Sequence, residues 1–230
     1  MHIAISPRTT LTRLLWTIGI LVLASSMGVA WFIAYPPTEQ VPAWIAWFNV
    51  NVEGNIPTLF SSLQLVAAAA LLGVIGQCHR QRVQPFALWY ALAFIFLFLA
   101  IDETAALHEN LTVNVRTALG TSGYLHFAWV IPYGIAVLLM AAVFAKFLFR
   151  LPRPTMLHFI MSGTLFLTGA LGFEMLGGSY ISTPGAQEIT YSVIYTVEET
   201  LEMVGIALFI YSLMKYITTQ FVQLDLSVRE

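Results

Sequence analysis

Six apolar windows along the chain constrain its fold more than any other feature. Each is long enough to cross the roughly 30 Å hydrocarbon core of a membrane as a helix, which takes about 20 residues. The expected spans are Leu11–Tyr35, Pro57–Gln77, Pro85–Ile101, Leu125–Phe149, Met156–Gly177 and Tyr191–Ile217. Of the 230 residues, 58% are hydrophobic and only 10% are charged, a balance that the surface of a soluble domain does not tolerate. The sequence therefore predicts an all-α, polytopic integral membrane protein.

The connections between these windows are too short to hold a separate soluble domain. We expect residues 1–230 to form a single domain, a bundle of six transmembrane helices. Arg8 and Arg13 precede the first window as in a signal peptide, but its apolar run exceeds the roughly 7–15 residues of a signal core, so we expect a retained helix. The single Cys78 excludes an intramolecular disulfide and a thiolate metal cluster.

The basic residues predict how the bundle is oriented. Six spans place the loops and ends alternately on two sides, and nine of the ten Lys and Arg residues fall on one of them, Arg229 included. That side is expected to be cytoplasmic by the positive-inside rule, which puts both termini inside. Ten of the twelve acids, Glu39 among them, fall on the outer side, where Arg116 is the single base. The outer face is thus expected to be acidic.

Several ionisable groups lie at the outer ends of three spans, within segments that otherwise belong in lipid. The stretch "FLFLAIDETAALHEN" begins as an apolar helix and ends in acids and an imidazole, and the fifth and sixth spans add four glutamates. An ionisable group inside a membrane is costly and usually functional. The predicted site residues are Asp102, His108, Glu109, Glu174, Glu198, Glu199 and Glu202. Glu39, Glu53, Glu103 and Glu188 are expected instead to be solvated acids at the membrane surface.

Carboxylates that converge in a low dielectric cannot all stay charged and unpaired, so they must share protons or bind a cation. Carboxylates and imidazole without thiolate favour a divalent iron, manganese or zinc ion. His126, Tyr195 and Ser62 are candidates for supporting hydrogen bonds around such a site. On an ideal helix Asp102 and Glu109 face the same way, whereas His108 is rotated by about 120°. His108 can therefore join them as a ligand only if the helix end is distorted.

Three short motifs carry a resemblance to a known group of proteins. The stretches "EGNIPTLFSS", "DETAALHE" and "EETLEM" resemble a family of uncharacterised bacterial multi-pass membrane proteins. The resemblance covers most of the chain and implies no activity. It implies a location in the bacterial inner membrane, which would turn the acidic face toward the periplasm.

Three functions agree with this pattern. The first is a divalent-metal site that opens to the periplasm and serves a membrane enzyme acting on a lipid-soluble substrate. The second is a pathway for protons or cations through the same acids, which the apolar inner halves of the helices make less favourable. The third is a structural or assembly subunit whose acidic face docks a periplasmic partner. The lipid bilayer is the expected environment, and no nucleic-acid motif is present, while a protein partner or oligomeric state is not predicted.

Overall fold

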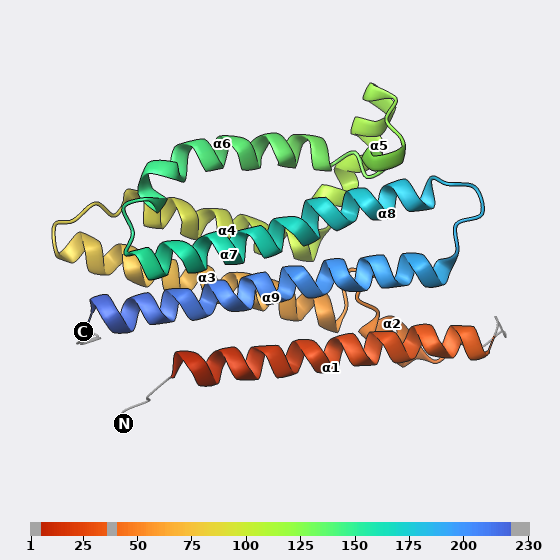
Figure 1. Cartoon of the computed structure of the whole chain (residues 1–230), viewed down its shortest axis with the longest axis horizontal. Coiled ribbons are helices and arrows are strands. Elements are labelled where there is room, and N and C mark those ends of the chain that lie inside the picture. The colour runs from red at the N-terminus through yellow and green to blue at the C-terminus, as the bar shows by residue number, and fades with distance from the viewer. Residues whose placement is uncertain (1–5, 36–40, 222–230) are drawn as a thin grey trace.

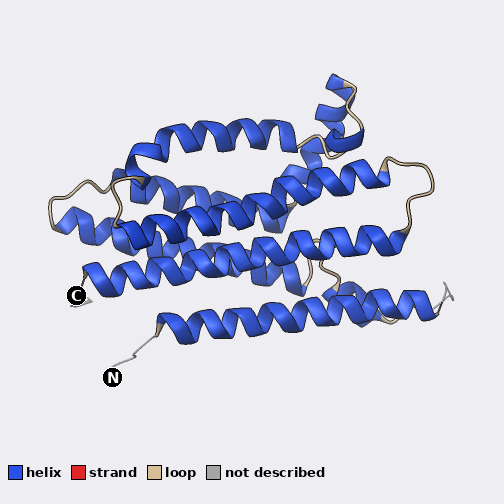
Figure 2. Cartoon of the chain, in the orientation of Figure 1, coloured by secondary structure: helices blue, strands red, loops and turns tan. Residues whose placement is uncertain are grey.

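The computed structural model describes residues 6–35 and 41–221, and every element within these ranges is a helix (Figure 2). The predicted all-α class is confirmed for this part of the chain, whereas Glu39, Arg229 and the expected inner termini lie outside it. The elements are α1 (Pro7–Ala34), α2 (Ala43–Phe48), α3 (Ile56–Gln81), α4 (Ala87–Ala105), α5 (Leu107–Leu119), η1 (Gly123–Leu125), α6 (Val130–Leu148), α7 (Arg153–Leu167), η2 (Thr168–Phe173), α8 (Glu174–Ile181) and α9 (Glu188–Gln220).

The long helices lie side by side along one axis of the molecule (Figure 1). Helix α1 begins and α9 ends at the same end, which we call the terminal end, and α2 and α5 lie at the opposite end, which we call the α5 end. Within residues 6–35 and 41–221, five helical stretches are long and apolar enough to cross a membrane: α1, α3, α4, α6 and the continuous run Arg153–Ile181. Helix α9, the sixth expected span, is not among these five and carries four glutamates in the half nearer its α5 end.

The core of the bundle lies between α3, α4, α7 and α9. Leu72, Ile75 and Leu213 have no exposed surface, and the large Trp89 is 2% exposed. Deep burial of these side chains is the main source of packing energy inside the bundle. Helix α6 differs, since Val130 is the buried residue that it contributes. Its other side chains are at least partly exposed, as expected of a helix that faces lipid over most of its length.

Two glycines let α7 and η2 approach α9 closely. A Cβ atom added at Gly169 would lie 2.7 Å from the carbonyl oxygen of Glu198, and one added at Gly205 would lie 2.8 Å from the backbone nitrogen of Phe166. Such distances leave no room for a side chain. Gly169 lies in η2, a π-helical segment that interrupts the predicted fifth span and immediately precedes Glu174. Such π-helical insertions frequently mark functional sites.

Candidate metal centre at the α5 end

A sharp turn separates α4 from α5 and places the first residues of the site. Ala106 adopts a left-handed conformation with φ of 51°, so α4 stops and α5 starts in a new direction. Ala106 has no side chain that can cap α5, and the buried Asp102 takes over that task. Its Oδ1 atom accepts a hydrogen bond from the backbone N–H of His108 at 2.9 Å. The turn is the distortion that His108 requires in order to lie near Asp102.

Acidic groups contact both nitrogens of the His108 ring. Nδ1 lies 3.3 Å from Oδ2 of Asp102, and Nε2 lies 3.5 Å from Oε1 of Glu53. Trp129 packs against the ring edge to face, with a centroid distance of 4.8 Å. Asp102 holds the proton on Nδ1, which leaves Nε2 as the atom that can bind a cation. The orientation of the imidazole is therefore fixed from two sides.

Glu53 reaches this ring from a short ordered loop between α2 and α3. The side chain of Asn55 donates hydrogen bonds to the carbonyl oxygens of Ala46 and Asn49 at 3.1 and 2.7 Å, and its Oδ1 caps α3 by accepting from the N–H of Thr58. The loop is thus tied to α2 and α3 at both ends. The second carboxylate oxygen of Glu53 is buried without a hydrogen-bond partner.

Glu53, His108 and Glu109 form the group that could hold a metal ion. One ligand atom from each residue lies within 4.8 Å of the other two. Metal–ligand bonds to nitrogen and oxygen are about 2.0–2.6 Å long, so ligands around one ion lie roughly 3–4 Å or slightly more apart. Small side-chain movements would bring these three atoms to a common ion.

The electrostatics of this group favour the uptake of positive charge. Burial raises the pKa of the Glu53 carboxyl to about 7; His108 offsets part of this rise, and Glu109, Glu103 and Asp102 add to it. Burial by itself would lower the pKa of the His108 imidazole, but the hydrogen bond and charge of Asp102 together with Glu53 raise it above its ordinary value. Protons or a divalent cation can supply the missing positive charge, and they compete for the same atoms.

A second set of carboxyl groups lies beside the first, between α8 and α9. Oε1 of Glu174 accepts a 2.7 Å hydrogen bond from the indole N–H of Trp129. The carboxyl groups of Glu174 and Glu198 face each other closely enough for a hydrogen bond, which would require one of them to hold a proton. Glu199 and Glu202 extend this set along α9 and also lie near Glu103, so the two sets adjoin. Trp129 links the two sets because it contacts both His108 and Glu174.

The predicted supporting residues have other partners. Nε2 of His126 lies 3.2 Å from the guanidinium of Arg116, and its Nδ1 lies 3.1 Å from the hydroxyl of Ser182. Burial and the nearby Arg116 charge lower the pKa of His126, so the ring is a neutral bridge between α5 and α8. Tyr195 is buried against Tyr191, with ring centroids 5.4 Å apart. The hydroxyl of Ser62 donates to the carbonyl oxygen of Ala100 at 2.9 Å.

The structure therefore divides the seven predicted site residues into two sets. Asp102, His108 and Glu109 gather around the Ala106 turn, whereas the four glutamates of α8 and α9 form the second set. Sequence reasoning missed Glu53, which looked like a solvated acid because it follows a polar loop. The signal that could have found it is Asn55, a helix cap that ties this loop to α2 and α3.

Comparisons with known proteins give a family but no described activity. A stretch of 118 residues is 30% identical to cytochrome b of Mycosarcoma maydis and covers 51% of this chain but 27% of that protein. The chain thus matches about a quarter of the length of this curated relative. No solved structure matches the chain. A family model described as a domain of unknown function (DUF8692) matches residues 9–216. The chain belongs to this DUF8692 family, which agrees with the resemblance to an uncharacterised membrane family.

Proposed function

We propose that this protein is a membrane enzyme that binds a divalent metal ion at its α5 end and acts on a lipid-soluble substrate. The observation that carries the proposal is the group of Glu53, His108 and Glu109, whose ligand atoms lie within 4.8 Å of one another. Asp102 supports it by orienting His108, as a carboxylate does in many histidine metal sites. The ion would supply Lewis-acid or redox chemistry, and iron, manganese and zinc suit these ligands.

The topology that we propose has six spans, with both termini in the cytoplasm and the metal centre facing the periplasm of a bacterial inner membrane. Helix α1 begins and α9 ends at the same end of the bundle, which supports an even number of membrane crossings (Figure 1). Arg82 caps α3, and Arg150 and Arg153 flank the start of α7, all at that terminal end. The positive-inside rule assigns this end to the cytoplasm. We also propose that residues 1–230 act as one domain.

The similarity to a cytochrome b raises the question of a haem, but the surroundings of His79 and His108 fit a haem poorly. Haem iron is commonly held by histidine, with room for the porphyrin on one side of the ring. His79 stacks on Trp89 at 5.5 Å and lies 5.5 Å from Phe221 and 6.1 Å from Tyr216, so aromatic rings fill the surrounding space. At His108 both ring nitrogens already face carboxylates. We therefore propose a directly bound ion rather than a haem.

A pathway for protons is the second candidate, and one contact favours it. Glu174 and Glu198 lie close enough to share a proton, and Glu199 and Glu202 follow Glu198 along α9. From these glutamates toward the terminal end the bundle core is apolar, with Ile206, Phe209 and Leu213 buried along α9. A proton that enters the second set of carboxyl groups thus meets an apolar core, and the metal centre remains the better-supported function.

Metal analysis of the purified protein tests the proposal. After loading with manganese, iron or zinc and removal of the excess, the protein should retain about one ion per chain, as a site with a single shared centre requires. Glu53→Gln and Glu109→Gln each remove a charged ligand and should lose this ion. Glu188→Gln is the matched control, because Glu188 is an exposed acid at the start of α9. A wild-type protein free of metal after loading, or ligand variants that retain it, would overturn the proposal.

A further inference from the structure

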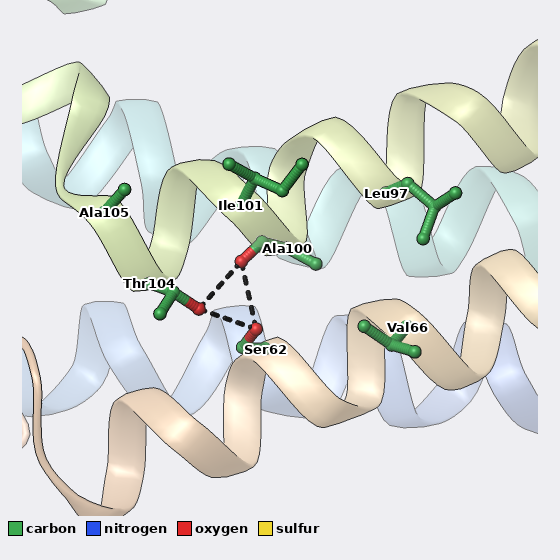
Figure 3. A pocket seen from close by; sticks show the side chains of 7 residues that line it. All are labelled: Ser62, Val66, Leu97, Ala100, Ile101, Thr104 and Ala105. Atoms are coloured by element: carbon green, nitrogen blue, oxygen red, sulfur yellow. Dashed lines mark hydrogen bonds between the residues drawn. The ribbon is translucent and has the colours of Figure 1, made fainter.

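A hollow of about 330 Å³ opens between α3 and α4 (Figure 3). Four small side chains line part of it, the buried Ser62 and Ala100 and the exposed Thr104 and Ala105. Val66, Leu97 and Ile101 form its rim and are 42%, 45% and 59% exposed. The volume is within the range of about 300–1,000 Å³ that is usual for small-molecule sites.

The hydroxyl groups in the hollow are turned toward the protein. Thr104 donates to the oxygen of Ser62 at 2.9 Å, and Ser62 donates in turn to the carbonyl oxygen of Ala100 (Figure 3). Thr104 also lies 3.0 Å from that carbonyl. Because both hydroxyl hydrogens are used internally, the surface left to a ligand is hydrocarbon. A polar ligand would lose its hydrogen bonds with water and gain none here.

The hollow leads toward the candidate metal centre. Its lining on α4 runs from Leu97 to Ala105, which is about 12 Å along a helix. Ala105 directly precedes the Ala106 turn, and His108 follows two residues later. The lining residues Ser62 and Thr104 directly follow Ser61 and Glu103 in the chain, so the apolar hollow adjoins the acids of the α5 end along α3 and α4. A chain lying along α4 would thus have one end at the level of the metal centre.

We propose that this hollow binds the hydrocarbon chain of a membrane lipid, with the chain end near Leu97 and the polar head at the Ala106 turn. Both helices are long and apolar enough to span a membrane, so the rim meets lipid chains as its immediate surroundings. The apolar side chains of Val66, Leu97 and Ile101 suit a hydrocarbon chain, whereas a polar headgroup finds no charged partner among the lining residues. The proposal rests on the proposed function for one point, the assignment of this lipid as the substrate of the metal centre.

Photo-crosslinking with two fatty acids tests both the occupant and its direction. The protein is reconstituted into phosphatidylcholine vesicles with palmitic acid that carries a diazirine either at the chain end or beside the carboxylate. The chain-end probe should label peptides that contain Val66 and Leu97, and the second probe should label residues around Ala105. An excess of unlabelled palmitic acid should remove both signals. Labelling at Leu138 on α6, which is 72% exposed to lipid, should persist as the signal of bulk lipid.

Two variants of α3 separate the hollow from its surroundings. Val66→Phe places a large ring in the hollow and should abolish the labelling that palmitic acid removes. Leu63→Phe changes a 57% exposed residue of the same helix that lies outside the hollow, so the labelling that palmitic acid removes should remain. The proposal would be overturned if labelling were as strong at Leu138 as in the hollow and resisted competition. Reversed positions of the two probes would also overturn it, as would a Val66→Phe variant that is labelled like wild type.

Metal content, measured in the same samples, distinguishes failure of this inference from failure of the proposed function. Val66→Phe should keep its bound metal, because it changes no ligand. Glu53→Gln should lose metal and still show the competed labelling. A wild-type protein that is labelled in the hollow but binds no metal would refute the enzyme while leaving the lipid site, whereas bound metal without competed labelling would refute the lipid site alone.

Discussion

The two ends of the bundle each hold a histidine among aromatic rings, yet the two histidines have different partners. At the α5 end, His108 packs against Trp129 and Tyr133 at 4.8 and 6.3 Å. At the terminal end, His79 packs against Trp89 and Tyr216 at 5.5 and 6.1 Å. The packing is alike, so aromatic burial alone does not indicate what either ring does.

The atoms around the ring nitrogens make the difference. His108 has Asp102 and Glu53 at its two nitrogens, whereas Nε2 of His79 lies 2.9 Å from the hydroxyl of Tyr216 and its Nδ1 is buried without a partner. A phenol can hold a neutral imidazole in place but cannot provide the negative charge that a cation needs. His79 therefore joins α3 to α9, while His108 has the surroundings of a metal ligand.

Exchanging each histidine for glutamine should give the largest contrast between the two ends. His108→Gln removes the ligand nitrogen and should abolish stoichiometric binding of Mn²⁺. Binding is measured by electron paramagnetic resonance as a decrease in the signal of free Mn²⁺, and the variant should not show this decrease. His79→Gln should leave Mn²⁺ binding at the wild-type level and lower the thermal midpoint, because Gln loses the ring stacking with Trp89. Equal loss of Mn²⁺ binding in both variants would show that general destabilisation, not ligand chemistry, explains the effect.

Removing the partner of each imidazole should have a smaller effect. Asp102→Asn keeps an oxygen that can cap α5 but removes the charge beside Nδ1, so metal affinity should fall by about 10–100-fold. Tyr216→Phe removes the hydroxyl that contacts His79 and should not change metal affinity. Isothermal titration with Zn²⁺ measures both. An Asp102→Asn protein with wild-type affinity would mean that Asp102 serves only to cap the helix.

The sequence predicts the bundle well because a membrane span needs a long apolar run, and this requirement is local. Helices α1, α3 and α4 differ from their expected ranges by a few residues at each end. The Ala106 turn and the π-helical η2 could not be predicted in this way. Both depend on contacts across the bundle: Asp102 reaches past the turn to cap α5, and Gly169 fits η2 against α9.

The candidate site was predictable in part for the same reason. Acids within spans are conspicuous, so Asp102, Glu174 and Glu202 stand out in the sequence. The change of direction at Ala106 places His108 between Asp102 and Glu53, so the set around this ring includes the loop before α3. Glu53 lies 55 positions before His108 in the sequence, and no spacing rule connects two residues so far apart.

In metal-free protein, the pH dependence of stability should distinguish the acidic α5 end from the terminal end. The pKa of Glu53 is raised from its ordinary value of 4.5 to about 7 in the folded state. The folded protein thus binds this proton more tightly than the unfolded chain does, so the stabilisation is complete below pH 4.5 and is lost as the pH rises to about 7. The raised pKa of His108 acts in the same direction at higher pH, whereas the lowered pKa of His126 removes stability as the pH falls below 6.5.

Glu53→Gln should therefore flatten the decline in the thermal midpoint between pH 4.5 and 7, measured in the presence of a chelator. Gln cannot titrate, and it also removes the negative charge that helps to raise the pKa of His108. His126 is unchanged in both proteins, so its contribution cancels in the difference between the two curves. Parallel curves for wild type and Glu53→Gln would show that this carboxyl has an ordinary pKa.

The smallest effect is expected at Glu202, in the second set of carboxyl groups. If this set is neutralised by shared protons, Glu202 is already a neutral acid, and Gln has nearly the same shape. Glu202→Gln should then keep its metal and its thermal midpoint, or gain slightly in stability, with and without chelator. If Glu202 instead belongs to the metal centre, the same change removes a charge and a ligand together, and the stabilisation that metal gives to the folded state should decline. Two results together would show that the two sets form one site: a wild type that chelator destabilises, and a Glu202→Gln variant that binds less metal and is less stable. The second set would then bind the same metal ion as His108 instead of sharing protons.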